Sequence, residues 1–264
     1  MTLSADYLTA CEQAARAGGR VLLDWIGRFG VREKGPSDLV TQADLASQEA
    51  IRGILLVDFP RHALVSEEGD RQLDASNEYC WVVDPLDGTT NYVHGLPHYT
   101  VSVALLHDGR PIVGTILDPV HDECFTCARG EGAFLGGQPI RTSNVQELSG
   151  ALVTASFAAK VQAGSREIDQ FVAAVLNCQA VRRTGSAALN LAYVAAGRVD
   201  AFWALSTYAW DVAAGVLLVE EAGGVVTNLD GGPFDIRTPH PIATANRTLH
   251  EQFCKLLQDA RKLG

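Results

Sequence analysis

The sequence predicts an α+β arrangement in the first half of the chain and an α/β arrangement in the second. Two segments with helically spaced apolar residues come first, and a run of short apolar strands follows them. After residue 145, strands and helices alternate, which is typical of an α/β layer. We therefore divide the chain into residues 1–145 and 146–264, and this length allows one large domain or two modest ones.

The first half begins with two predicted helices. Apolar residues recur at helical spacing between Leu8 and Trp25, and Ser4 can cap this helix. A second helix spans residues 44–59, where Pro60 stops it. Strand-like segments then follow, with glycine-containing turns between several of them: HALVSE, YCWVVD, YTVSVALL, PIVGTILD and ECFTCAR.

The second half alternates between the two kinds of element. Its expected strands are ALVTAS, QAVRR, DAFWAL, VVTN and PIATA. Its expected helices lie around residues 168–176, in SAALNLAYVAAG, in DVAAGVLLVEEAGG and from near Thr248 to the end. No internal repeat or low-complexity tract is visible.

Composition narrows the class of protein. The 47% apolar and 20% charged residues are ordinary for a soluble globular protein. No run of about 18 apolar residues predicts a membrane span, and the first residues lack the pattern of a signal peptide. A formal charge of −10 disfavours non-specific binding to nucleic acid, which needs clustered basic residues.

Cysteine usage agrees with a reduced, cytoplasmic setting. Six dispersed cysteines do not form a disulfide framework. The one C-x-x-C pair, Cys124 and Cys127, lies on a predicted strand, where residues three apart point to opposite faces. We therefore interpret this pair as structural.

The segment WVVDPLDGTTNYVHG, residues 81–95, points to a metal and phosphate site. It places Asp84 and Asp87 at the end of a buried strand, where like charges repel unless a cation lies between them. Mg²⁺ prefers such oxygen ligands, and the Leu86 carbonyl is another. Gly88 allows a phosphate to approach the main chain, and Thr89 offers an N–H group and a hydroxyl. A simple turn is the alternative, since D-P and D-G pairs favour turns.

Three other acidic features favour the metal site. Glu67 follows a predicted strand in VSEEGD, Asp44 stands at a helix start in DLVTQAD, and Asp211 heads an apolar helix in YAWDVAAG. Separately, the two aspartates could be helix N-caps and the glutamate part of a solvated loop. One shared cation site accounts for all of them together.

Several motifs of the chain resemble those of a known family. WVVDPLDGTTNY and WDVAAGVLLVEEAGG resemble the two signatures of the inositol monophosphatase family, with Tyr92 in place of a phenylalanine. SEEG, DLVTQAD, GEGAF and GSAALN resemble further segments in the family's order, so the resemblance covers nearly the whole chain. It implies a layered αβαβα sandwich of the sugar-phosphatase type, with an active site between its halves. It also implies a homodimer and a lithium-sensitive, Mg²⁺-dependent phosphomonoesterase.

The resemblance implies roles by motif position. Two or three Mg²⁺ ions, for which Mn²⁺ can substitute, would be held by Glu67, Asp84, the Leu86 carbonyl, Asp87 and Asp211. Glu67 and Thr89 would orient and deprotonate a metal-activated water, with Asp44 near the threonine. Contacts to the phosphate and the substrate alcohol would come from Gly88, Thr89, Gly185, Ser186 and Ala187, beside Asp87 and Asp211.

The substrate is less well defined. Inositol-cleaving relatives usually have a glutamate at the position of Ala204, which cannot accept hydrogen bonds from ring hydroxyls. We expect hydrolysis of inositol 1-phosphate or a similar small polyol or sugar phosphate, with weak discrimination. Histidinol phosphate, fructose 1,6-bisphosphate and nucleotide 2′- or 3′-phosphates are alternatives on the same fold. A regulatory binding protein that retains the fold is the alternative from another class.

Overall fold

The computed structural model describes residues 3–28, 30–35, 38–74, 77–158 and 160–260. Its first half contains α1 (Leu3–Trp25), β1 (Val31–Gly35), β2 (Asp38–Thr41), α2 (Gln42–Asp58), β3 (Ala63–Ser66), β4 (Tyr79–Asp87), α3 (Thr89–Val93), β5 (Thr100–His107), β6 (Arg110–Asp118), β7 (Glu123–Ala128), β8 (Gly132–Leu135) and β9 (Gln138–Pro139). Its second half contains η1 (Leu148–Gly150), β10 (Leu152–Ser156), α4 (Arg166–Asn177), β11 (Ala180–Arg182), α5 (Ala187–Ala195), β12 (Ala201–Ala204), α6 (Ala209–Glu221), β13 (Val225–Asn228), β14 (Pro241–Thr244) and α7 (Arg247–Asp259).

The larger sheet has seven strands in chain order, β3 to β9, and each neighbouring pair is antiparallel except β3 and β4. Strand β4 is buried on both faces. Trp81 and Val83 pack in the core beneath α1 and α2, whereas Cys80 and Val82 belong to the core on the other side. This alternation follows from the two-residue period of a strand. The core on both faces holds β4 in place, and Asp84 and Asp87 lie at the end of this strand.

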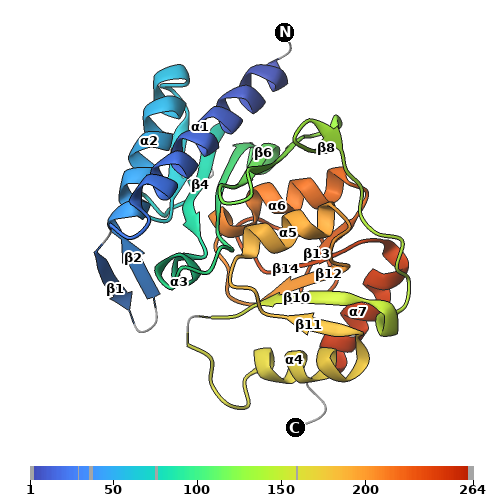
Figure 1. Cartoon of the computed structure of the whole chain (residues 1–264). Coiled ribbons are helices and arrows are strands. Elements are labelled where there is room, and N and C mark those ends of the chain that lie inside the picture. The colour runs from blue at the N-terminus through green and yellow to red at the C-terminus, as the bar shows by residue number, and fades with distance from the viewer. Residues whose placement is uncertain (1–2, 29, 36–37, 75–76, 159, 261–264) are drawn as a thin grey trace.

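The smaller sheet has the order β11-β10-β12-β14-β13. Strand β10 pairs in parallel with β11 and β12, and the remaining pairs are antiparallel. Helices α5 and α6 lie between the two sheets, and α4 and α7 cover the outer face of the smaller one (Figure 1). With α1 and α2 on the far side of the larger sheet, the layers alternate as αβαβα (Figure 1). The predicted layered sandwich is confirmed.

Glycines set the depth at which α6 enters this sandwich. A Cβ at Gly114 of β6 would lie 2.9 Å from the Ala214 Cα atom, and one at Gly215 would lie 2.5 Å from the Leu191 Cβ atom. Real Cβ atoms do not approach other atoms so closely, so both contacts require glycine. The close fit places α6 against β6 and α5, and with it Asp211 at the helix N-terminus.

The two halves share a core. One apolar cluster contains Val82 of the larger sheet, Leu217 of α6 and Phe202 of the smaller sheet. The chain passes from one sheet to the other between Pro139 and Leu152. We propose residues 1–145 and 146–264 as structural halves joined by this core.

Some local predictions differ from the structure. Helix α1 begins at Leu3, so Ser4 lies in its first turn and does not precede it. The β1–β2 hairpin and the short helix α3 were not predicted, because VREKG and TTNYV show no clear apolar period. Cys124 and Cys127 belong to different cores on opposite faces of β7, as predicted. Among the described residues, no helix is long and apolar enough to cross a membrane.

Candidate active site

The acidic residues of the predicted metal site come from both halves of the chain. Asp84 and Asp87 lie at the end of β4, Asp211 lies in the first turn of α6, and Glu67 follows β3. Burial raises the pKa of Asp84 well above its usual range, and the charges of Glu67, Asp87 and Asp211 raise it further. These interactions place the four carboxylates close to one another.

Asp84 and Asp211 lie close enough to repel each other, because the charge of Asp211 raises the pKa of Asp84. Burial raises the pKa of Asp211 well above its usual range, and the charge of Asp87 adds to this, whereas the Tyr208 N–H group, 2.8 Å from Asp211 Oδ2, lowers it. A proton here offsets repulsion that a bound cation could also relieve.

Asp87 links the larger sheet to helix α5. Its Oδ2 atom accepts hydrogen bonds from Ser186 Oγ at 2.6 Å and the Ala188 N–H group at 2.7 Å, and Oδ1 accepts from the Ala187 N–H group at 3.3 Å. Burial raises the pKa of Asp87 to about 6, although these donors lower it. The Ser186 hydroxyl and the Ala187 amide therefore contact Asp87 here, and the contact with a substrate alcohol that the family resemblance implies stays a prediction.

Thr89 connects Asp44 to the metal-binding segment. Its hydroxyl lies 3.3 Å from Asp44 Oδ1 and 3.2 Å from the Leu86 carbonyl oxygen. Asp44 is the third residue of α2, where its Oδ2 atom accepts hydrogen bonds from the N–H and hydroxyl groups of Thr41, which is the helix N-cap. Burial raises the pKa of Asp44 to about 6, and the bonds from Thr41 lower it. Asp44 thus belongs to a capping box and also faces the candidate site.

Glu67 is held by its main chain beside the same cluster. Its N–H group donates to the Val83 carbonyl at 3.3 Å, and its carbonyl accepts from Arg71 Nε at 2.8 Å. Its charge contributes to the raised pKa values of Asp84, Asp87, Asp211 and Asp44. Glu67 is therefore close to every other predicted acidic group of the site.

Two glycines are required by backbone geometry at the site. Gly88 has φ 99° and precedes α3, and a Cβ there would lie 3.0 Å from the His98 carbonyl oxygen. Gly185 has φ 96°, and a Cβ there would lie 2.8 Å from Asn91 Nδ2. Such φ values favour glycine. Asn91 was not predicted: its Nδ2 atom donates to the carbonyls of His98 and Thr184, so it joins the segments around both glycines.

The donor chemistry of the site fits a hard divalent cation. Such a cation binds carboxylate and carbonyl oxygens, which the cluster supplies from Glu67, Asp84, Leu86, Asp87 and Asp211. Across the described residues, however, no three Asp, Glu, His or Cys side chains converge in a ready metal-binding arrangement. Instead, the Asp87 carboxylate accepts hydrogen bonds from α5, and the Asp211 carboxylate accepts one from the Tyr208 N–H group.

The structure changes the interpretation of Ala204. This residue ends β12, is fully buried and belongs to the shared apolar core. A carboxylate approaches the adjacent loop from another segment: Glu167 Oε1 accepts hydrogen bonds from the Ala158 N–H group at 2.9 Å and from Ser206 Oγ at 3.3 Å. Sequence reasoning missed Glu167 because it reaches this loop from a separate helix, α4.

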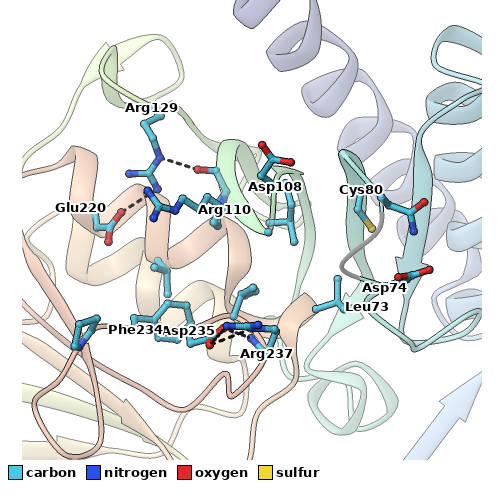
Figure 2. Close-up of a pocket in the computed structure, with 17 residues that line it drawn as sticks. Leu73, Asp74, Cys80, Asp108, Arg110, Arg129, Glu220, Phe234, Asp235 and Arg237 are labelled. Atoms are coloured by element: carbon cyan, nitrogen blue, oxygen red, sulfur yellow. Dashed lines mark hydrogen bonds and ion pairs between the residues drawn. The ribbon is translucent and has the colours of Figure 1, made fainter.

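A separate cavity of about 770 Å³ lies at the other ends of β4 and α6. Cys80 at the start of β4 and Glu220 near the end of α6 line it, as do Arg110, Arg129 and Arg237. Figure 2 shows Arg129 paired with Glu220 and Arg237 paired with Asp235 around this cavity. Its described lining contains none of the predicted site residues, so we do not assign the active site to it.

Comparison with known proteins decides the family. A sequence profile described as the inositol monophosphatase family matches residues 3–262. The chain belongs to the inositol monophosphatase family. It is similar to an inositol monophosphatase from Anabaena (Nostoc) sp. PCC 7120, with 39% identity, a TM-score of 0.86 and coverage of 98% of this chain and 97% of that one.

Other members of the family carry a different name. A protein of Pasteurella multocida named Nus factor SuhB is 39% identical over 253 residues, which is 94% of this chain and 95% of that protein. The crystal structure of the extragenic suppressor protein suhB from Bartonella henselae is 35% identical, with a TM-score of 0.90 and coverage of 96% and 98%. Membership of the inositol monophosphatase family therefore includes proteins named for activity and proteins named for other roles.

Proposed function

We propose that this protein is a Mg²⁺-dependent phosphomonoesterase that acts on inositol 1-phosphate or a similar small polyol or sugar phosphate. The main support is the cluster of Asp84, Asp87, Asp211 and Glu67, in which burial and mutual repulsion raise the pKa values of the three aspartates. Burying so much negative charge is unfavourable unless a cation or protons compensate it. Such clusters occur where function requires them.

Divalent cations, when bound by Glu67, Asp84, the Leu86 carbonyl, Asp87 and Asp211, would supply positive charge for the phosphoryl oxygens and a water of lowered pKa. The chain's own groups would position that water. The Thr89 hydroxyl has one proton to donate, either to Asp44 or to the Leu86 carbonyl, which leaves its lone pairs able to accept from a water. Asp44, with a pKa of about 6, can hold a proton delivered through Thr89 Oγ1.

The contacts to the phosphate and to the substrate alcohol are proposed from the positions of the residues. The main-chain N–H groups of Gly88 and Thr89 would donate to the phosphate, as the family resemblance implies. Ser186 and the Ala187 amide would act through Asp87, since both donate to it. Gly185, at the turn beside Asn91, would lie next to the substrate alcohol.

A phosphate-release screen tests this function. Purified protein would be incubated with inositol 1-phosphate, glycerol 2-phosphate, histidinol phosphate, fructose 1,6-bisphosphate and nucleotide 2′- and 3′-phosphates, with Mg²⁺, with Mn²⁺ and with a chelator. We expect release that requires a divalent cation and that Li⁺ inhibits. Release from histidinol phosphate alone, or from fructose 1,6-bisphosphate alone, would identify that compound as the substrate. Undiminished release after thorough chelation would contradict the metal assignment.

A regulatory role is a second candidate, because similar proteins are named Nus factor SuhB. In that case binding of a partner, and not turnover, would be the task of the chain, and the homodimer predicted from the family could form part of the binding surface. Complementation distinguishes the two. If Asp211→Asn restores the phenotype of a strain lacking the gene as well as the wild type does, while phosphate release is abolished, the regulatory role is the physiological one.

A further inference from the structure

The wall of the candidate site beside Asp211 is aromatic. Tyr208 stacks on Trp210 with ring centroids 4.7 Å apart and an interplanar angle of 13°. The Arg71 guanidinium carbon lies 5.7 Å from the centroid of the Trp210 ring, within the range of a cation–π contact. Trp210 is buried, whereas Tyr208 is 58% exposed. One face of the Tyr208 ring is therefore covered by Trp210, and its other face is open.

This wall contacts the site from two sides. The Tyr208 N–H group donates to Asp211, and Arg71 Nε donates to the carbonyl of Glu67. Arg71 thus ties the loop that carries Glu67 to the helix that carries Asp211. Tyr208 lies three residues before Asp211, a proposed metal ligand, and its main-chain N–H group contacts that carboxylate directly.

The same loop offers little to a polyol. Ser206 Oγ donates to Glu167, and Thr207 Oγ1 donates to the Pro239 carbonyl oxygen, so the two aliphatic hydroxyl donors are used within the protein. Ala204 is buried and has no polar side-chain atom. Between β12 and α6, Ser206 and Tyr208 are both exposed, and of these two only Tyr208 has an aromatic ring.

We infer that Tyr208 is a specificity-determining residue whose open face stacks on a planar, aromatic leaving group, so that nucleoside phosphomonoesters are favoured over small polyol phosphates. This inference rests on the proposed phosphatase function and names its substrate class. Stacking of a base on an aromatic side chain contributes to binding without reading the identity of the base. The preference should therefore be for planarity, and not for one nucleobase.

Three substrates and two variants test this. Adenosine 2′-monophosphate, uridine 2′-monophosphate and glycerol 2-phosphate all release a secondary alcohol, but only the first two carry a planar base. The readout is the ratio of kcat/KM for each nucleotide to that for glycerol 2-phosphate. Tyr208→Ala should lower both ratios by at least about fivefold, whereas Tyr208→Phe, which keeps the ring, should leave them within about twofold. Leu176→Ala, at an exposed position of α4, is the control for handling and should change neither ratio.

The outcomes separate this inference from the function on which it rests. If the wild type releases no phosphate from any of the three substrates, the proposed function fails. If it releases phosphate but Tyr208→Ala changes kcat/KM for all substrates by the same factor, or for none, the stacking role of Tyr208 is wrong while the phosphatase function stands. A loss in Tyr208→Phe equal to that in Tyr208→Ala would also overturn it, because the ring would not be the cause.

Discussion

Asp87→Asn should stabilise the protein when divalent cations are absent. Asp87 is buried, and its pKa of about 6 lies above the value of about 4 for an aspartate in an unfolded chain. The folded protein therefore binds a proton more tightly than the unfolded chain does, so this group makes the protein less stable as pH rises from about 4 to about 6. At pH 7.5 the full difference applies and corresponds to at most about 3 kcal/mol of unfolding free energy.

Urea unfolding followed by circular dichroism measures this effect. In a chelator at pH 7.5, we expect the variant to be more stable than the wild type, by up to about 3 kcal/mol. The difference between the two proteins should shrink as pH falls below 6. With Mg²⁺ at 100 times its Kd, the advantage of the variant should largely disappear, because the cation stabilises the wild type by about 2.7 kcal/mol.

A surface aspartate provides the control for this measurement. Asp24→Asn, on the exposed side of α1, should change none of these values by more than about 0.5 kcal/mol. If Asp87→Asn is less stable than the wild type in chelator at pH 7.5, then the donors from Ser186 and α5 outweigh burial, and the electrostatic account of the cluster is refuted.

Three further changes have expected outcomes. Thr89→Val removes the hydroxyl that lies against Asp44 and should lower phosphate release by about 100-fold, whereas Thr89→Ser should retain most of it in the same assay. Gly185→Ala should lower the unfolding free energy, measured by urea unfolding, by about 1–3 kcal/mol, because Gly185 has φ 96° and a Cβ there would meet Asn91. Gly27→Ala, at φ 73° in open space, is the control and should cost less. Equal losses in the two variants would contradict the close contact at Gly185. Ala204→Glu should destabilise the protein by several kcal/mol, because the position is fully buried; a variant of unchanged stability with improved turnover of inositol 1-phosphate would show that this side chain reaches the substrate.

The architecture could be predicted from the sequence because the spacing of apolar residues clearly distinguishes its helices from its strands. Strands β4 to β7 of the larger sheet are apolar runs buried on both faces, and α5, α6 and the strand between them alternate without long loops. The β1–β2 hairpin could not be predicted, since VREKG and DLVT carry no strong apolar alternation. Helix α3 has five residues, too few for a period of 3.6 to be visible.

The residues of the site were predicted by type, but their partners were not. The motifs identified Asp84, Asp87 and Asp211, because carboxylates at the ends of buried elements are unusual. The hydrogen bond from Ser186 to Asp87 joins residues 99 positions apart, so no local pattern indicates it. The same holds for Glu167 with Ser206, which lie 39 positions apart, and for Arg71 with Trp210, which come from different halves of the chain.

The most direct test of the central claim is phosphate release from inositol 1-phosphate as a function of Mg²⁺ concentration, by the wild type and by Asp211→Asn. If the carboxylate cluster holds the cation that hydrolysis requires, wild-type release should rise from zero in chelator to a plateau. The variant should reach a plateau lower by about 100-fold or more, with a folded circular dichroism spectrum. Equal plateaus for the two proteins, or wild-type release that does not depend on Mg²⁺, would contradict this assignment.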